Sequence, residues 1–192
     1  MPKRSYQRAY EILSQYDYPP VGSHGNTNNG EVYRLGGVSK MNFGRCGDPA
    51  HPGAMGDPLR SRVAEIVANG GYPAEGFGFD LNGFAGAPRP RFGPDTTCGT
   101  VPQSNPITYP FTSYAGDVTF TQPHLGTRTV DFNTEGMIHI GLLPELIEDV
   151  RRDGTSDKDL EPLFRSAEGY LRMWEKAERR GAELRGPQAS PD

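Results

Sequence analysis

One carboxylate stands out in the stretch GFGFDLNGFAG, residues 76–86, because it ends an alternating apolar run. Such a run is typical of a buried strand, yet this one closes on Asp80 and continues into Asn82 and Gly83. An isolated ionised carboxylate beside a hydrophobic core is strongly destabilising unless it is paired or bound to a metal. We therefore expect Asp80 to have a partner.

A second residue with suitable chemistry is His24, which ends the run PPVGSH before the polar loop GNTNNG. Ligands of parallel α/β proteins collect at the carboxyl ends of the strands, and both His24 and Asp80 end a predicted strand. One imidazole and one carboxylate on the same face of a sheet suit zinc, or a base beside a metal-bound water. Two simpler roles stay open: His24 as a solvated or helix-capping residue, and Asp80 as an Asx-turn or N-cap residue of the glycine loop.

The other histidines lie in less informative patterns. His51 and His124 stand in turns, where we expect surface positions, and His139 stands in the alternating run GMIHI, where we expect a satisfied, half-buried ring. The sequence contains no phosphate-binding loop ending in Lys-Ser/Thr, and no GxSxG, HExxH or CxxC motif. Familiar nucleophile, phosphate and metalloprotease signatures are therefore absent from the sequence.

Hydrophobic periodicity predicts the elements that position these residues. Residues 36–84 read as strand, loop, helix and strand, which is a βαβ unit and favours a parallel sheet. Residues 85–115 form a turn-dense excursion, and residues 117–133 read as one hairpin around Pro123–Gly126. Ser156 and Asp159 have capping-box spacing. The predicted strands are 19–24, 36–43 and 76–80, and the predicted helices are 5–17, 57–71, 141–154 and one or two within 155–180, with Leu160, Leu163, Phe164, Leu171 and Trp174 as their apolar residues.

We expect one domain over residues 1–180, with the excursion and hairpin at 85–133, and a disordered tail at 181–192. The length of 192 residues suits a single domain with its own core. The fold class is α/β.

Composition excludes some partners. The net charge of −4 and the scattered arginines give no basic surface for a nucleic acid. No stretch approaches the length of a membrane span, and no signal peptide follows Met1. As written, the chain suggests a cytoplasmic protein, or a secreted one if a signal lies on a missing N-terminal segment. Cys46 and Cys98 form either one bridge or two free thiols.

The order of these pieces resembles the C-terminal part of the membrane (renal) dipeptidase family, which are metal-dependent hydrolases on an amidohydrolase-type (β/α)₈ barrel. PPVGSHGN is similar to the sixth strand of that family, GGVSKMNF to the seventh, and GYPAEGFGFDLNGF to the eighth. GLLPELIEDVRRDG and the residues after it resemble the terminal helices. The resemblance spans most of residues 9–178 apart from the excursion, and implies strands 6 to 8 of a TIM-type barrel with an added loop and hairpin.

The resemblance also implies roles for individual residues. His24 would bind zinc, and Asp80 would contact the metal and the metal-bound water and carry its proton. Arg34, in the loop after the sixth strand, lies near the position of a substrate-binding arginine. Asn82 stands where the family usually has a second aspartate, and would face the substrate.

The family draws its remaining metal ligands from strands 1, 3 and 5, and this chain has nothing before strand 6. Our leading hypothesis is a dipeptidase-like hydrolase of a small-molecule or peptide substrate, incomplete in this chain and completed by an N-terminal barrel half or by homo-oligomers. The alternative is an inactive truncated barrel that acts as a binding or scaffold module. A third reading is a small secreted β-rich protein with a Cys46–Cys98 bridge.

Overall fold

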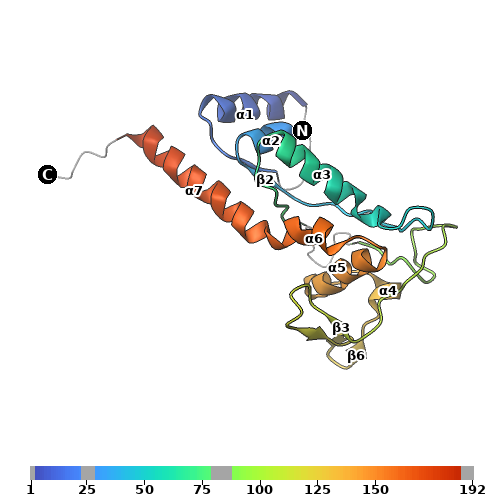
Figure 1. Ribbon diagram of the computed structural model, residues 1–192. Helices are drawn as coiled ribbons and strands as arrows, with labels where there is room; N and C mark the ends of the chain where they lie inside the picture. Colours follow the sequence, from blue (N-terminus) through green and yellow to red (C-terminus); the bar gives the residue numbers. More distant parts are fainter. Residues whose placement is uncertain (1–2, 23–28, 79–87, 187–192) are drawn as a thin grey trace. The chain divides into compact units, whose positions relative to one another are not determined.

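The computed structural model of the chain describes residues 3–22, 29–78 and 88–186 (Figure 1). The chain divides into two compact units. Unit 1 comprises residues 1–41, 60–78 and 161–192, and unit 2 comprises residues 42–59 and 79–160. The chain therefore passes between the units several times, and the helices that begin at Asp57 and Asp157 each contain residues of both.

Unit 1 contains three short segments that pair in parallel. β1 (Val21–Gly22) pairs with β2 (Val38–Ser39), and Lys40, next in the chain, forms a parallel bridge with Gly76. Backbone hydrogen bonds fix this register, since Met41 N donates to Gly76 O at 2.7 Å and Gly76 N donates to Ser39 O at 3.0 Å. The segments are thus adjacent in sequence order, and the predicted parallel pairing is confirmed.

Helices connect and cover these segments. Val32 and Tyr33 of α2 are almost fully buried against Ile66 of α3, and Tyr10 of α1 packs on the same cluster. The α3 helix ends before Gly70, whose φ of 74° suits the glycine that commonly follows a helix. The α7 helix lies beside β2 (Figure 1). The helix bounds are α1 (Lys3–Gln15), α2 (Asn29–Arg34), α3 (Asp57–Ala68), α6 (Asp157–Phe164) and α7 (Ser166–Arg185).

The α7 helix differs from its prediction in two ways. It continues through Gly181 to Arg185 and ends at Gly186, so residues 181–185 are helical and not part of a disordered tail. Its residues Leu171 and Trp174, predicted to face a core, are exposed, as is Phe164 of α6. The face that packs on unit 1 carries Met173, which is outside the predicted set, together with Lys176 and Arg180, which donate to Leu35 O and Tyr16 O.

Unit 2 is built around α5 (Leu143–Arg152). Pro144 lies in its first turn and Gly154, with a φ of 108°, follows its end, as the sequence predicts. Leu146 and Val150 are buried, and Asp159 N donates to Ser156 Oγ at the start of α6, which confirms that part of the predicted capping box. The remaining elements are η1 (Ala54–Gly56), α4 (Phe132–Glu135), η2 (Ile140–Leu142) and four two-residue strands, β3 (Phe111–Thr112), β4 (Thr119–Phe120), β5 (His124–Leu125) and β6 (Arg128–Thr129).

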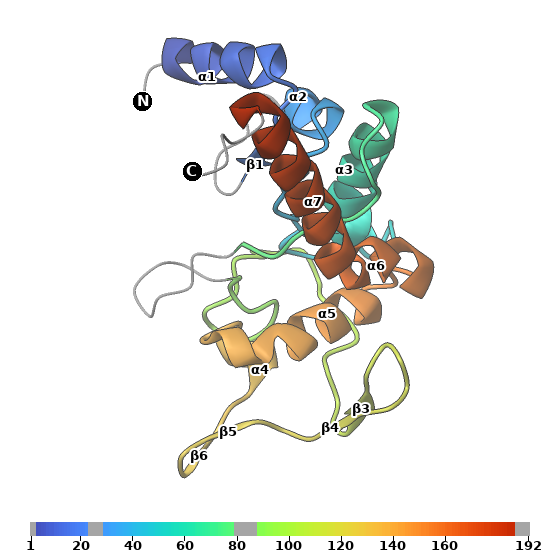
Figure 2. The same cartoon turned by 90° about the vertical axis from the view of Figure 1, so that its left-hand side faces the viewer.

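The hairpin predicted over residues 117–133 is confirmed in part, because β5 and β6 pair around Gly126, whereas β4 pairs with β3 and not with the second half of that range. β3 pairs with β4, and β5 pairs with β6, so two antiparallel hairpins follow one another (Figure 2). Each has its own turn with a glycine at positive φ, Gly116 in the first and Gly126 in the second. The Phe111 and Phe120 rings stack across the first hairpin with centroids 5.1 Å apart. This cross-strand contact stabilises the pairing of β4 with β3.

Among the described residues, no helix is both long enough and apolar enough to cross a membrane.

Candidate functional site

Three of the four predicted site residues, His24, Asp80 and Asn82, lie outside the described residues. What the structure describes is the sheet that precedes two of them in the chain. His24 follows β1 by two positions, and Asp80 follows Gly76 by four. Because β1, β2 and the Gly76 segment are parallel, their carboxyl ends lie at one edge of the sheet.

Arg34, the fourth predicted residue, is the last residue of α2 and does not lie in a loop as predicted. Its side chain is half exposed and its guanidinium is already engaged. Nη2 donates to Glu31 Oε2 at 2.6 Å and to Ser14 Oγ at 2.8 Å, and Nε donates to both Glu31 oxygens. These contacts hold the pKa of the Glu31 carboxyl below its usual range. A substrate carboxylate would have to compete with Glu31 for Arg34.

A buried polar cluster lies beneath the same sheet segments in unit 1. Glu75, directly before Gly76, is 0% exposed, and its Oε1 accepts a hydrogen bond from Ser39 Oγ at 3.1 Å. Ser39 Oγ also lies 2.5 Å from Tyr33 Oη, which receives a longer hydrogen bond from Arg62 Nη1 at 3.4 Å. The second carboxyl oxygen, Glu75 Oε2, has no hydrogen-bond partner among the described residues. Sequence reasoning missed this cluster.

Burial changes the acidity of Glu75. Removal from water disfavours the charged form and raises the pKa of this carboxyl to about 7, against the opposing effects of Ser39, Arg62 and Tyr33. The nearby Glu65 carboxylate raises the pKa further, and burial also raises the pKa of Tyr33. Glu75 is therefore a buried group that exchanges a proton near neutral pH. Strongly shifted groups of this kind occur at functional sites and also in structural networks.

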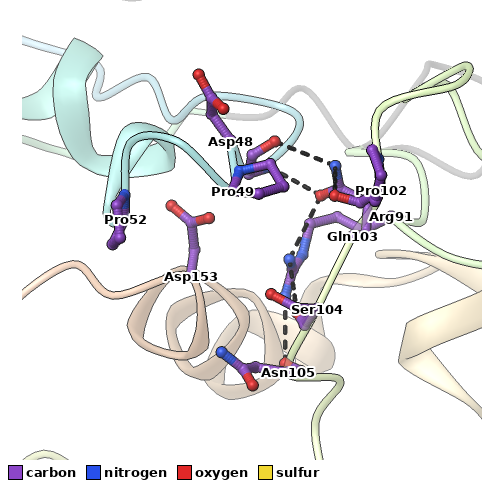
Figure 3. Close-up of a pocket in the computed structure, with 10 residues that line it drawn as sticks. Asp48, Pro49, Pro52, Arg91, Pro102, Gln103, Ser104, Asn105 and Asp153 are labelled. Carbon is purple, nitrogen blue, oxygen red and sulfur yellow. Dashed lines mark hydrogen bonds between the residues drawn. The ribbon is translucent and has the colours of Figure 1, made fainter.

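Unit 2 contains a small surface pocket with a volume of about 90 Å³ (Figure 3). Asp48 and Asp153 supply carboxylates to its wall, and Arg91 and Gln103 line the other side. Asp153 Oδ2 accepts from Met55 N at 2.8 Å, and Gln103 Oε1 accepts from Gly47 N at 2.8 Å. These contacts show that the side chains brace neighbouring loops, so the pocket has mainly a structural origin.

A buried ion pair lies behind this pocket. Arg91 donates through Nε and Nη2 to Asp149 of α5, with the shortest contact at 2.8 Å, and both residues are 4% exposed. The remaining guanidinium hydrogens contact Gln103 Oε1 and the carbonyls of Ser104 and Asn105. Arg91 is thus surrounded by acceptors and joins the excursion to α5.

Cys46 and Cys98 form a disulfide with a Cα–Cα distance of 5.6 Å, which decides between the two states that the sequence left open. The bridge closes a loop of 52 residues. Loop closure of that size contributes about 4 kcal/mol of stability in the chain-entropy treatment. It holds the middle of the excursion against the loop before α3.

No group of three or more His, Cys, Asp or Glu side chains that could hold a metal ion occurs within residues 3–22, 29–78 and 88–186. His51 and His124 are exposed, as expected from their turns. His139 caps η2 through Nδ1, which accepts from Gly141 N, and its buried Nε2 lacks a partner in the described part of the chain. It is therefore only half satisfied.

The residues that sequence reasoning missed share one property: their partners are remote in the chain. Glu75 meets Ser39 across 36 positions and Arg91 meets Asp149 across 58. The one available signal for Asp149 is its place beside Val150 in an amphipathic helix, on the buried side. Glu75, between Ala74 and Gly76 in a turn-like stretch, has no comparable signal.

Comparisons of this chain with protein-family models, with curated proteins and with solved structures find no match.

Proposed function

We propose that this chain supplies part of the active site of a metal-dependent hydrolase that cleaves an amide or peptide bond through a zinc-activated water. The ordered series of motifs that resemble strands 6 to 8 and the terminal helices of the dipeptidase family supports this proposal. The observation that carries it is the parallel pairing of β1, β2 and the Gly76 segment in sequence order. Consecutive strands of a (β/α)₈ barrel pair in this way.

In this proposal, His24 is a zinc ligand and Asp80 contacts the metal and handles the proton of the attacking water. A bound zinc would lower the pKa of that water toward neutrality. Asn82 and Arg34 would contact the substrate, and Arg34 would first have to release Glu31. The remaining ligands would come from a complementary N-terminal barrel half or from a second copy of the chain.

A second candidate is a non-catalytic binding or scaffold module. The specific observation in its favour is the construction of the excursion in unit 2, which is braced by the Cys46–Cys98 bridge and by the Arg91–Asp149 pair. A braced loop region offers a preformed surface, which lowers the entropy cost of binding. The same bridge supports the secreted alternative for localisation, because disulfides persist in oxidising compartments.

Zinc binding tests the first candidate directly. We expect the chain co-expressed with a polypeptide that supplies barrel strands 1 to 5 to retain zinc after gel filtration, and the variants His24→Ala and Asp80→Ala to retain much less. His124→Ala is the matched control, because His124 is an exposed histidine in unit 2, and should bind zinc like the wild type. Equal zinc content in all four proteins would contradict the assigned ligands.

Hydrolysis is the second measurement. The chain is assayed with dipeptides alone and after co-expression with a polypeptide that supplies barrel strands 1 to 5. We expect turnover only in the co-expressed sample, with loss of turnover in Asp80→Ala. A co-expressed complex that forms but neither binds zinc nor hydrolyses any dipeptide would favour the scaffold candidate and refute the hydrolase.

A further inference from the structure

The long helix α7 has two faces with different roles. One face packs on unit 1: Met173 is buried, the Ala74 side chain approaches the backbone of Gly169 so closely that a Cβ there would lie 2.7 Å from it, and Lys176 Nζ donates to Leu35 O at 2.9 Å. The other face carries large apolar side chains that are between 47% and 55% exposed, namely Tyr170, Leu171, Trp174 and Leu184. Exposed apolar groups that cluster on one helix face mark an interaction surface more often than scattered ones do.

The spacing on this exposed face alternates between three and four residues over nearly the whole helix. That alternation is the heptad pattern of a helix that packs along a second helix. We define the α7 seam as the residues at these positions: Ala167, Tyr170, Trp174, Ala177, Gly181 and Leu184.

The sizes of the side chains along the α7 seam indicate which helix would pack against it. Large and small side chains are arranged so that the seam is complementary to itself when a second copy runs in the opposite direction. Tyr170 then meets Gly181, Trp174 meets Ala177, and Leu184 meets Ala167, each from the other copy. In a parallel pair, Trp174 would meet Trp174 and Gly181 would meet Gly181, which alternates overpacked layers with voids.

We propose that the α7 seam is a dimer interface, at which two copies of this chain pair their α7 helices antiparallel about a two-fold axis between Trp174 and Ala177. The proposal does not depend on the hydrolase function.

Charges beside the α7 seam favour the same direction. In the antiparallel pair, Glu178 flanks Leu171 of the second copy, so no like charges oppose each other there. The Arg185 guanidinium lies over Gly181, 3.5 Å from the position of a Cβ there. It would therefore meet the Tyr170 ring of the second copy, which suits a cation–π contact.

The size of the interface sets the expected strength. About half of four large apolar side chains corresponds to roughly 400 Å² per copy, or roughly 800 Å² in total. This area lies below that of stable complexes. We therefore expect a reversible dimer that forms only as the protein concentration rises.

The first test measures the molar mass of the protein as a function of its concentration. We expect sedimentation to show a mass that rises from the monomer value of 21.0 kDa toward twice that value. Trp174 is the only tryptophan, so its emission should shift to shorter wavelength as dimers form.

Ala177→Glu places a charge in the centre of the interface and should weaken dimerisation about tenfold or more. Ala182→Glu, an exposed alanine of the same helix outside the α7 seam, is the matched control and should dimerise like the wild type.

A second variant separates dimer loss from misfolding. Gly181→Leu should stabilise the helix itself, because leucine has a higher helix propensity than glycine. It also fills the space that Tyr170 of the second copy occupies. We therefore expect a better folded monomer with weaker dimerisation. A monomer at every concentration, or a dimer unaffected by both Ala177→Glu and Gly181→Leu, would refute the proposal.

Spin labels at a cysteine introduced by Ala182→Cys test whether the two α7 helices run antiparallel or parallel. The two labels are separated by thirteen residues along an antiparallel pair, which corresponds to about 20 Å at 1.5 Å per residue. In a parallel pair they would lie side by side, at roughly 10–15 Å. A short distance would overturn the antiparallel arrangement. Binding of the monomer to lipid vesicles without any self-association would show that the seam serves a membrane surface instead.

Discussion

Two buried carboxyl groups, one in each unit, are stabilised in opposite ways. Asp149 in unit 2 meets the guanidinium of Arg91, whereas Glu75 in unit 1 meets only hydroxyl groups and leaves one oxygen without a partner among the described residues. Burial raises the pKa of both groups, but Arg91 opposes the rise at Asp149 through direct contacts. Burial raises the pKa of Glu75 to about 7, so a bound proton neutralises this carboxyl where Arg91 neutralises Asp149.

The difference has a consequence for each unit. A guanidinium stays charged at every physiological pH, so the Arg91–Asp149 pair is constant in geometry and charge. A proton is lost as the pH rises, so the Glu75 cluster is stable only in a limited pH range. Unit 1 should therefore respond to pH near neutrality, and unit 2 should respond to the loss of its arginine.

The largest expected effect is the removal of Arg91. Arg91→Met leaves Asp149 buried without its cation, and breaking a buried ion pair from one side costs about 3–5 kcal/mol. The carbonyls of Ser104 and Asn105 lose a donor at the same time. Denaturant unfolding followed by circular dichroism should show a much lower midpoint. Since Trp174 lies in unit 1, its fluorescence provides a separate record of that unit.

The double variant Arg91→Met/Asp149→Leu sharpens this test. Replacement of both partners by apolar groups removes the uncompensated charge, so most of the lost stability should return. Arg8→Met is the control, because its ion pair with Glu11 is exposed and should contribute almost nothing. If the double variant is as unstable as the single one, the deficit comes from lost packing and the comparison of the two carboxyls is wrong.

The same contrast explains how much of the fold could be predicted. The parallel segments appear as expected, and so do the start and end signals of α5 and the start signal of α6, because Pro144, Gly154 and Ser156 act on their own neighbours. The hairpin around Gly126 forms as expected, but the first hairpin was not predicted, because β4 pairs back with β3 through the turn at Gly116. Periodicity alone does not rank such partners.

Less of the candidate site could be predicted. The chemistry assigned to His24, Asp80 and Asn82 falls outside the described residues, and Arg34 lies in a helix beside Glu31. Glu75 and Asp149 are buried by contacts made across 36 and 58 positions, which no short motif encodes. A charged residue in a sequence is expected at the surface until a partner is known.

The pH response of unit 1 is the next effect in size. Glu75 has a folded pKa of about 7 against an ordinary value of 4.5, so the folded state holds its proton more tightly than the unfolded state. Stability is therefore fully present below pH 4.5, falls as the pH rises toward 7, and levels off above 7. The expected loss is about 3 kcal/mol, at 1.36 kcal/mol per pKa unit. Unfolding followed by Trp174 fluorescence at several pH values measures it.

Glu75→Gln keeps the shape of the side chain and removes the titration. We expect this variant to be more stable than the wild type at pH 8 and to show a flatter pH profile between pH 5 and 8. Glu65→Gln is the control. Glu65 is partly exposed, so its replacement should leave most of the change of stability with pH. Identical slopes in Glu75→Gln and wild type would assign the pH response to other groups.

The smallest expected effect comes from the hydroxyl that supports the cluster. Tyr33→Phe removes the contact between Tyr33 Oη and Ser39 Oγ, at a cost of about 1 kcal/mol for a buried hydrogen bond. The Tyr33 hydroxyl also helps to lower the pKa of Glu75, so its removal should raise that pKa and move the fall in stability to higher pH. Tyr16→Phe, at an exposed ring of the same unit, should change neither quantity. A loss of stability in Tyr33→Phe without a shift along the pH axis would mean that the hydroxyl supports packing alone and does not lower the pKa of Glu75.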